Sequence, residues 1–498
     1  MSHTSDDFDR ALVAAVHPPT WTNPTPAGRY NLVVIGGGTA GLIAAVGAAS
    51  LGARVALIER HWLGGDCLHY GCVPSKALIR AARAAYDVRT ATELGIAVHA
   101  PRVDFPAVME RMRRLRAQIA PHDSAARLTG IGIDVYFGAA RFVARDAVEI
   151  GGARIAFARA VIATGARPAI PSIPGLAELS PFTSETVFSL TELPRSLLVI
   201  GGGPIGCELA QAFRRFGSEV TILDREVRLL PREDREASAI VQAQLAREGV
   251  RLILGVTLTG ASRAGDTTTL SYQRAGVTES CTGERILVAA GRAPNVEDLA
   301  LNVAGVEANP RGVVVDDHLR TTNPRIFAAG DIASRFQFTH AADAMARIAL
   351  QNALFFGRKR ASALVMPWCT YTDPEVAHAG LSEQDAKDRH SDVATLTAQL
   401  AANDRAVLDG ETDGFGRVYV DRKGRILGAT LVARHAGESI GEAVLAMTTK
   451  QKLGALAATI HPYPTQAEIW KRLGDAYNAR RLTPRVRSVL GWLMRRRR

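Results

Sequence analysis

Two cysteines, Cys67 and Cys72, lie five residues apart in the segment GGDCLHYGCVPSK, residues 64–76. On an ideal α-helix, Cα atoms with this spacing are roughly 8–9 Å apart, whereas a disulfide tolerates a Cα separation of at most about 7 Å. The thiols can therefore bond only where the backbone bends, and Gly71, which has no Cβ, offers such a point. A disulfide closed under this constraint is easier to reduce than a structural one. The spacing indicates a working redox couple.

His69, between the two cysteines, raises a metal site as the alternative. A structural zinc site needs four ligands, and no second cysteine pair exists to complete one. The other cysteines, Cys207, Cys281 and Cys369, are isolated, and we expect them to be small buried side chains. We therefore predict no metal site and no disulfide framework.

A strand, a glycine turn and a helix are predicted from Tyr30 onward. Gly36, Gly38 and Gly41 form a GxGxxG fingerprint, which permits a tight turn and brings a helix N-terminus to a pyrophosphate. Glu59, at the end of the second strand, is placed to accept hydrogen bonds from ribose hydroxyls. These residues predict a first dinucleotide site.

The same pattern recurs about 165 residues later, where Gly201, Gly203 and Gly206 are followed by Asp224. A carboxylate at this position favours NADH because it repels a 2′-phosphate. Two arginines within the next four residues leave NADPH open. Two such units indicate two separate doubly wound α/β domains.

Two further segments end apolar strands at places that could face a ligand. VIATGARP, residues 161–168, puts Thr164 and Gly165 in a turn after the strand. TTNPRIFAAGDIA, residues 321–333, delivers Asp331 from a strand end. Taken alone, Asp331 could equally be a helix N-cap.

The charge of the chain is concentrated at its C-terminus. The formal net charge is +11, but residues 480–498 contain eight arginines and no acid, which leaves about +3 for the rest. This balance argues against a nucleic-acid-binding face on the body. No apolar run of 18 residues predicts a transmembrane helix. Asp6, Asp7 and Asp9 precede any apolar run, so we expect no signal peptide and a cytoplasmic location.

Together these motifs resemble the class I pyridine nucleotide-disulfide oxidoreductases, the family of dihydrolipoamide dehydrogenase, glutathione reductase and mercuric reductase. The resemblance covers roughly residues 30–479 and rests on C-x4-C-x-P-S-K, both GxGxxG units, ATG, GRxPN and the AAGD acid. It implies FAD in the first site, bound through Gly36, Gly38, Gly41, Glu59, Gly65, Lys76, Thr164, Gly165 and Asp331. It implies NAD(P)H in the second site, bound through Gly201, Gly203, Gly206, Asp224 and Gly291.

The resemblance also implies catalytic roles. In the family the second cysteine contacts the flavin and the first exchanges with substrate, which assigns these roles to Cys72 and Cys67. Lys76 would lie by the flavin and pair with Glu208. A cation there stabilises the reduced, anionic ring and an adjacent thiolate. Without the motif, this pair would be an ordinary salt bridge on a helix surface.

The segment HPYPTQAE, residues 461–468, departs from the family. Disulfide-reducing members have a histidine general acid–base, oriented by a glutamate, where this chain has Tyr463 and Glu468. A tyrosine with a pKa of about 10 is a poor proton shuttle. Mercuric reductases have a tyrosine there, but they also use C-terminal cysteines, and none follows Cys369. His461 is either a replacement base or a packing residue.

We therefore expect a homodimeric FAD-dependent NAD(P)H oxidoreductase that passes electrons through Cys67 and Cys72 to a small-molecule acceptor. The acceptor would be a small disulfide, a thiol-bound metal ion or a related compound, as in a mercuric reductase-like enzyme. Dihydrolipoyl dehydrogenase is the alternative enzyme. An alternative of another class is a redox-responsive protein with low turnover that binds a membrane surface.

The predicted fold class is α/β, with two doubly wound, Rossmann-like nucleotide-binding domains and a C-terminal α+β dimerisation domain. The predicted parts are an N-terminal arm (1–29), a FAD-binding domain (30–180 and 291–364), an NAD(P)H-binding domain (181–290), a dimerisation domain (365–479) and a basic tail (480–498). Prolines in HPPTWTNPTPAG favour an arm without regular structure. The tail is either a disordered, solvated segment or an amphipathic segment at the inner face of an anionic membrane.

Overall fold

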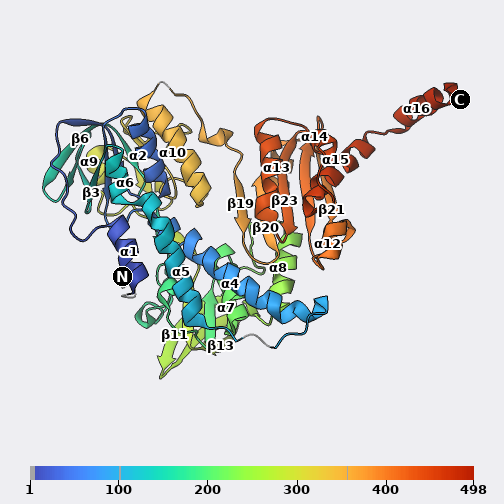
Figure 1. Ribbon diagram of the computed structural model, residues 1–498, viewed down its shortest axis with the longest axis horizontal. Coiled ribbons are helices and arrows are strands. Elements are labelled where there is room, and N and C mark those ends of the chain that lie inside the picture. Colours follow the sequence, from blue (N-terminus) through green and yellow to red (C-terminus); the bar gives the residue numbers. More distant parts are fainter. Residues whose placement is uncertain (1–5, 100–101, 356, 498) are drawn as a thin grey trace. The chain divides into compact units, whose positions relative to one another are not determined.

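The computed structural model describes residues 6–99, 102–355 and 357–497, and the chain divides into two compact units (Figure 1). The first unit runs to Arg225 and resumes over Arg251–Leu364, and the remaining residues form the second.

A seven-stranded sheet forms the centre of the first unit, in the order β3-β2-β1-β6-β5-β4, with β18 paired to β6. Its strands are β1 (Arg29–Ile35), β2 (Val55–Glu59), β3 (Ile133–Phe137), β4 (Arg141–Ala144), β5 (Ala147–Ile150), β6 (Ala153–Ile162) and β18 (Ile326–Ala328). Side chains of β1 alternate between two core clusters: Val34 faces one and Val33 the other. This strand is buried on both faces, which explains its continuous apolar run. Helices α2 (Thr39–Ser50) and α10 (Thr339–Leu354) lie side by side on one face (Figure 1).

A second parallel sheet, in the order β10-β9-β8-β14, repeats this design in the same unit. Its strands are β8 (Ser196–Ile200), β9 (Glu219–Asp224), β10 (Arg251–Leu254) and β14 (Arg285–Val288), with α7 (Pro204–Phe216) between β8 and β9. Smaller antiparallel pieces are β11 (Thr257–Ala264), β12 (Thr267–Arg274) and β13 (Val277–Gly283), β7 (Ala166–Pro168) with β15 (Arg292–Pro294), and β16 (Ala308–Asn309) with β17 (Gly312–Val313). The two predicted strand–turn–helix units are thus confirmed.

The remaining described helices of the first unit include the two that carry the redox cysteines. These remaining helices are α1 (Asp7–Val16), α3 (Gly65–His69), α4 (Cys72–Thr90), α5 (Phe105–Ile119), α6 (Ala125–Gly130) and α9 (Leu301–Ala304). The prediction of an arm over residues 1–29 is wrong for α1. Leu12 and Val16 of this helix are fully buried in the main core, although residues 17–28 form no helix or strand, as their prolines predict.

A five-stranded sheet forms the centre of the second unit, in the order β19-β20-β23-β22-β21. Its strands are β19 (Pro367–Thr370), β20 (Glu375–Gly380), β21 (Val393–Gln399), β22 (Phe415–Asp421) and β23 (Ile426–Ala433). Its helices are α8 (Arg235–Arg247), α11 (Glu383–Arg389), α12 (Asp404–Leu408), α13 (Ala436–Thr448), α14 (Leu453–Ala458), α15 (Ile469–Arg480) and α16 (Pro484–Arg496). All pairs in the sheet are antiparallel, as the alternating sequence of β22 and β23 predicts.

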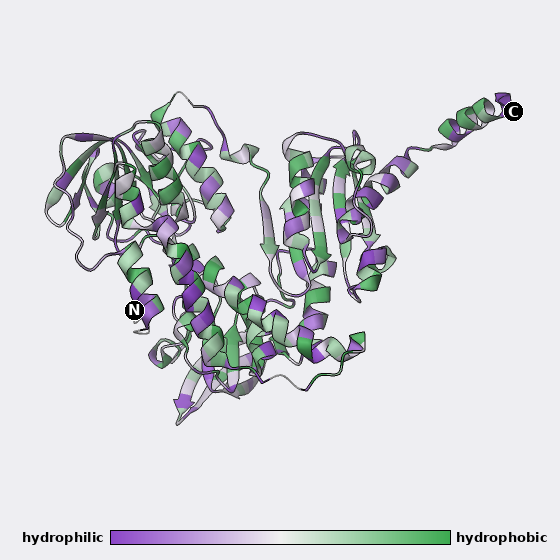
Figure 2. Cartoon of the chain, viewed as in Figure 1, coloured by the Kyte–Doolittle hydropathy of each residue, from purple (hydrophilic) through white to green (hydrophobic). Residues whose placement is uncertain are grey.

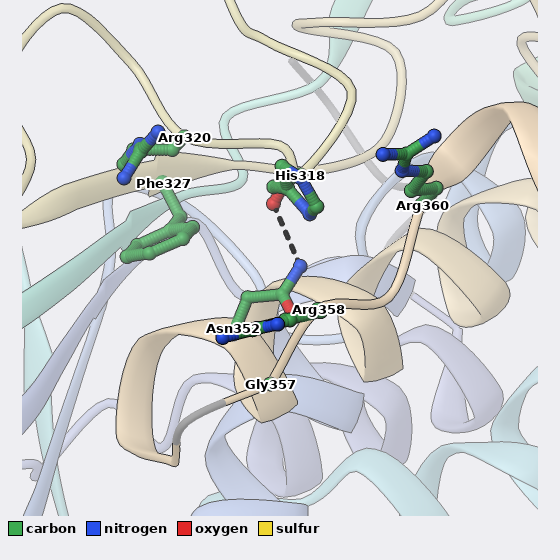
Figure 3. Close-up of a pocket in the computed structure, with 7 residues that line it drawn as sticks. All are labelled: His318, Arg320, Phe327, Asn352, Gly357, Arg358 and Arg360. Carbon is green, nitrogen blue, oxygen red and sulfur yellow. Dashed lines mark hydrogen bonds between the residues drawn. The ribbon is translucent and has the colours of Figure 1, made fainter.

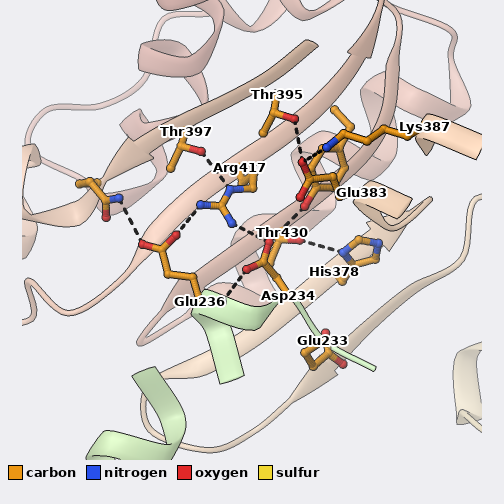
Figure 4. A network of polar contacts seen from close by, with 12 residues as sticks. Glu233, Asp234, Glu236, His378, Glu383, Lys387, Thr395, Thr397, Arg417 and Thr430 are labelled. Carbon is orange, nitrogen blue, oxygen red and sulfur yellow. Dashed lines mark hydrogen bonds and ion pairs between the residues drawn. The ribbon is translucent and has the colours of Figure 1, made fainter. Parts of the chain in front are cut away.

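Residues 226–250 group with this second unit, and a polar network accounts for it (Figure 4). Arg417 on β22 binds Asp234 at 2.6 Å and also contacts Glu236. The indole N–H of Trp368 donates to Glu233 at 2.7 Å. Burial raises the pKa of Glu233 to about 7, although the bond from Trp368 opposes the rise. The domain boundaries at residues 181 and 290 stay a prediction.

No helix within the described ranges is both long and apolar enough to cross a membrane.

Candidate redox-active site

The backbone breaks between Cys67 and Cys72, as their spacing requires. Cys67 lies in α3, which ends at His69, and Cys72 is the first residue of α4. Gly71 between the helices has φ −117° and ψ −113°. A Cβ at Gly71 would lie 3.0 Å from a side-chain oxygen of Asp66, so the close approach favours glycine. The predicted bend at Gly71 is confirmed.

The two thiols differ in acidity because their surroundings differ. A hydrogen bond from Cys67 lowers the pKa of Cys72, and the hydroxyl of Thr339, 3.3 Å from Cys72 Sγ, and the charge of Lys76 lower it further. The pKa of Cys72 falls to about 6. The same hydrogen bond raises the pKa of Cys67, whose proton it holds. In the dithiol state, Cys72 is therefore the thiolate and Cys67 the thiol.

Lys76 and Glu208 form the pair that the resemblance implies. Lys76 Nζ lies 2.8 Å from Glu208 Oε2, and it stands one turn after Cys72 on α4. Glu208 lies on α7, directly after the second glycine fingerprint, and only 6% of its side chain is exposed. The buried carboxylate holds the ammonium group close to the thiol pair.

Arg292 joins the thiol segment to the predicted flavin acid. Its guanidinium lies 3.3 Å from Asp66, which precedes Cys67, and 3.6 Å from Asp331. Burial raises the pKa of Asp331 to about 6, although Arg292 opposes the rise. Asp331 follows the end of β18, as its segment predicts, and it forms an ion pair with this arginine.

The first glycine fingerprint has the geometry of a nucleotide cradle. A Cβ at Gly41 would lie 1.8 Å from the carbonyl oxygen of Gly36, and Gly36 itself has φ +108°. Gly65 also needs to be glycine, because its Cβ would lie 2.6 Å from the Cα of Gly38. Glu59 accepts a hydrogen bond of 2.6 Å from the amide of residue 37, inside the loop. The residues fit a bound dinucleotide, whose pyrophosphate would meet the N-terminus of α2.

The second fingerprint repeats this arrangement. Gly206 would place a Cβ 1.9 Å from the carbonyl oxygen of Gly201, and Asp224 accepts from the amide of residue 202. By contrast, a Cβ at Gly203 or Gly291 would meet no protein atom within 4 Å. These two positions leave backbone open to a ligand, which fits the coenzyme site predicted there.

The turn after β6 also leaves backbone open. Gly165 has φ +67° and no atom within 4 Å of an added Cβ. The preceding Thr164 donates its hydroxyl to the carbonyl of Asn295, 2.8 Å away, and Asn295 returns a bond to the carbonyl of Thr164. The ATG and GRxPN motifs therefore hold each other in place.

Tyr463, His461 and Glu468 lie in the second unit and have separate partners. The hydroxyl of Tyr463 donates to Asp404 at 2.8 Å, and this bond raises the tyrosine pKa. His461 is 5% exposed, with Nε2 3.0 Å from Glu442. Glu468 lies 3.7 Å from Arg472. The charge of Glu468 also raises the pKa of Tyr463, in addition to the bond to Asp404.

Sequence reasoning missed several partners of the predicted site residues. Thr339 starts α10 and lies far along the chain from the thiols, so no local pattern connects them. Arg292 follows Gly291 in the GRxPN motif, which offered a usable signal. Asp404 and Glu442 carry no motif at all.

One cavity of about 330 Å³ lies in the first unit, and its described lining residues include no predicted site residue (Figure 3). Two of its three arginines have acidic neighbours: Arg320 binds Asp316 at 2.9 Å, and Arg360 lies 3.9 Å from Asp317. We assign it no role in the redox site. In the described part of the chain, no cluster of three histidine, cysteine or acidic residues could hold a metal ion, although this does not test the predicted absence of one.

Replacing Thr339 by valine tests the thiolate assignment. The change removes the hydroxyl beside Cys72 but keeps a β-branched side chain of similar size. We expect the pKa of Cys72 to rise, so alkylation of Cys72 by iodoacetamide near pH 6 should slow severalfold. Peptide mass spectrometry of the reduced enzyme across pH measures this rate, with Thr339→Ser as the matched control. An unchanged pH profile in the valine variant would contradict the assignment.

Two alanine substitutions test the second fingerprint. Gly203→Ala should fold, because its Cβ meets no protein atom within 4 Å, but the methyl group would obstruct the coenzyme. We expect its KM for NADH to rise about tenfold, equivalent to ~1.4 kcal/mol of binding, with FAD content unchanged. Gly206→Ala should instead fail to fold, because of the 1.9 Å contact. An unchanged KM for NADH in Gly203→Ala would contradict the prediction that the coenzyme binds at this loop.

Comparisons with known proteins agree with this geometry. Residues 30–346 match the pyridine nucleotide-disulphide oxidoreductase family, and residues 366–473 match the dimerisation domain of that family. A mercuric reductase from Bacillus cereus is 36% identical over 441 residues, covering 88% of this chain and 70% of that protein. A dihydrolipoyl dehydrogenase from Geobacillus stearothermophilus is 34% identical over 444 residues, covering 88% of this chain and 94% of that protein.

Solved structures are also similar. The HOCl-induced flavoprotein disulfide reductase RclA from Escherichia coli superposes with a TM-score of 0.79 and 30% identity, covering 90% of this chain and 99% of that one. Its Cu(II) complex gives a TM-score of 0.79 and 29% identity, covering 90% and 100%. The dimerisation domain supports a homodimer that acts on small molecules. The chain therefore belongs to the class I pyridine nucleotide-disulfide oxidoreductases, flavoenzymes that are FAD-dependent and use NAD(P)H.

Proposed function

We propose that this flavoenzyme passes electrons through Cys67 and Cys72 to a thiol-reactive acceptor, with a thiol-bound metal ion favoured over a disulfide. The observation that carries the proposal is the hydrogen bond from the Tyr463 hydroxyl to Asp404, at 2.8 Å. It keeps the phenol protonated at the position where disulfide-reducing relatives have a histidine base. A small disulfide stays the second candidate.

The thiol pair performs the exchange with substrate. Reduction of the disulfide consumes two electrons and one proton and gives the Cys67 thiol and the Cys72 thiolate. FAD, when bound, relays the electrons from NAD(P)H to the disulfide. In the dithiol, Cys67 keeps its proton while Thr339 and Lys76 stabilise the Cys72 thiolate. When Cys67 passes this proton to Cys72 along their hydrogen bond, Cys67 becomes the thiolate that attacks or binds the acceptor.

The acceptor determines whether a general acid is needed. A disulfide substrate leaves as a thiolate that must gain a proton, which a nearby acid with a pKa near neutrality supplies. A metal ion takes its two electrons from the reduced cysteine pair without gaining a proton, and the one thiol proton passes to water. Tyr463, whose pKa is raised, is poorly suited to the first reaction and does not impede the second.

His461 does not supply the missing base. Its Nε2 faces both carboxylate oxygens of Glu442, at 3.0 and 3.1 Å, and its Nδ1 lies 3.1 Å from the carbonyl of Thr459. Both ring nitrogens are thus engaged within the second unit, and the side chain is buried. A packing role for His461 follows from these contacts.

The relatives support both candidates. Mercuric reductases at 35–36% identity favour a metal acceptor, and the Cu(II) complex of the similar reductase shows that a protein of this fold binds a metal ion. Dihydrolipoyl dehydrogenase, at 34% identity, favours lipoamide.

The substitution Tyr463→His distinguishes these acceptors. Histidine restores a group with a pKa near 6.5, so we expect lipoamide or glutathione disulfide turnover to rise about tenfold to a hundredfold. Reduction of mercuric ion should change little. Steady-state assays with NADH measure each acceptor, and Tyr463→Phe is the control that removes only the hydroxyl. High lipoamide turnover by the native enzyme would overturn the preference for metal, and flavin that neither NADH nor NADPH reduces would overturn the redox role.

We also propose that the basic tail, residues 480–498, binds an anionic membrane surface at the inner face of the membrane. In α16, Val486, Val489, Leu490 and Leu493 repeat at helical spacing and are all exposed. Figure 2 shows hydrophobic and hydrophilic residues mixed along this helix. Arginines border the apolar face on both sides and no acid is present, which suits anionic lipid.

Removal of the tail tests this attachment. We expect deletion of residues 481–498 to lower binding to phosphatidylserine-containing vesicles at least tenfold, because each arginine near such a surface contributes about 1 kcal/mol. Vesicle co-sedimentation measures it, with purely zwitterionic vesicles and the variant Leu490→Ser/Leu493→Ser as controls. NADH-dependent turnover in solution should stay unchanged. Equal vesicle binding with and without the tail would end the proposal.

A further inference from the structure

A helix that precedes the family match packs against the redox segment. The match begins at residue 30, whereas α1 covers Asp7–Val16. Its side chains Leu12 and Val16 are fully buried in the same core cluster as Leu63 and Leu68, which flank the first redox cysteine in sequence. The family match does not include this helix.

A buried ion pair connects α1 to the end of the redox helix. Arg116 on α5 binds Asp9 at 2.7 Å, and the two side chains are 4% and 3% exposed. A second nitrogen of the same guanidinium donates to the carbonyl oxygen of His69, at 3.1 Å. His69 is the last residue of α3, which carries Cys67. One guanidinium therefore holds both α1 and the redox helix.

A second set of contacts joins the same two elements through the backbone. The amide of Leu63 donates to the carbonyl of Val16, the last residue of α1, at 3.2 Å. The carbonyl of Leu63 in turn lies 2.8 Å from Nε2 of the buried His69 ring. Helix α1 is therefore connected to the redox segment at two places. Asp9 connects to His69 through Arg116, and Val16 connects to His69 through Leu63.

The ion pair is costly for stability alone. Two buried charges lose their hydration, and an apolar pair of similar volume often stabilises a protein as well or better. What apolar side chains cannot supply is a planar fork that fixes two oxygen atoms in defined directions. Moreover α3 has only five residues, too few to hold its shape unaided. The fork acts on the carbonyl at the end of this short helix.

We propose that Asp9 and Arg116 are positioning residues for the Cys67–Cys72 couple, holding α3 so that Cys67 stays in bonding range of Cys72. The inference rests on the redox role proposed for that pair. Neither residue touches substrate or flavin in this role; both act through the His69 carbonyl.

The sign of the effect follows from the balance of the reaction. The disulfide takes up two electrons and one proton to give the Cys67 thiol and the Cys72 thiolate; NAD(P)H supplies both the electrons and the proton as hydride. Loosening α3 lowers the effective concentration of one thiol near the other. The disulfide then becomes less stable relative to the dithiol, so its reduction potential becomes less negative.

An apolar replacement separates positioning from stability. In full-length, FAD-loaded enzyme, Asp9→Leu/Arg116→Met keeps the packing and removes the fork. We expect it to fold with normal FAD content but to shift the dithiol–disulfide equilibrium about tenfold toward the dithiol, the size expected for one lost charge-assisted hydrogen bond. For a two-electron couple this corresponds to about 30 mV. Equilibration in glutathione buffers, followed by thiol trapping and mass spectrometry, measures it without any acceptor substrate.

Two further variants keep the test decisive. Arg116→Lys retains the charge but not the fork, so it should shift the equilibrium in the same direction even if the double variant fails to fold. Arg113→Met is the matched control, because Arg113 also joins α5 to the start of α1, through Asp6, without contacting the redox segment. The proposal would be overturned if Asp9→Leu/Arg116→Met and Arg116→Lys both kept the native reduction potential of the disulfide. An equal shift in Arg113→Met would also overturn it. Because no acceptor is used, this result is independent of the metal or disulfide preference.

Discussion

The interruption of the helix at Gly71 is the constraint on which the redox site depends. It separates α3 from α4, so that two thiols that would stand too far apart on a continuous helix come within hydrogen-bonding range. It also makes Cys72 the first residue of α4, where the helix dipole favours a thiolate. Lys76 follows one turn later on the same face. A single break in the backbone thus determines both the distance between the sulfurs and the charge around them.

The two glycine fingerprints share the same close backbone packing. In each, the carbonyl oxygen of the first glycine of the fingerprint occupies the space where a Cβ on the third glycine would lie. In each, the acid at the end of the next strand accepts from an amide inside the glycine loop, Glu59 in the first module and Asp224 in the second. Loop and acid therefore fix each other before any ligand binds. The Lys76–Glu208 pair then ties the thiol helix to the second module.

Much of this could be predicted from sequence because it is local. Glycine turns, strand ends and the acids that follow them are set by residues within about thirty positions of one another, and each leaves a readable pattern. Thr339 could not be predicted, since it reaches Cys72 across 267 residues. The Asp404 partner of Tyr463 was hidden for the same reason.

The N-terminal helix was missed differently. Leu12 and Val16 stand four residues apart, a helical spacing that was available in the sequence, but the prolines after them dominated the interpretation. The prolines that follow α1 end this helix, but they do not prevent the helix before them. Proline restricts the residues at and just before it, not a segment several residues upstream.

Because α1 packs into the core, it is part of the folded first unit. A shortened chain trimmed to the family boundary at residue 30 would keep every motif by which the family is identified. It would nevertheless uncover the apolar surface around Leu63 and leave Arg116 as a buried charge without its carboxylate. For expression, fusion or domain exchange, the useful boundary is therefore the start of α1, where a tag would extend from an exposed helix end and not from the core.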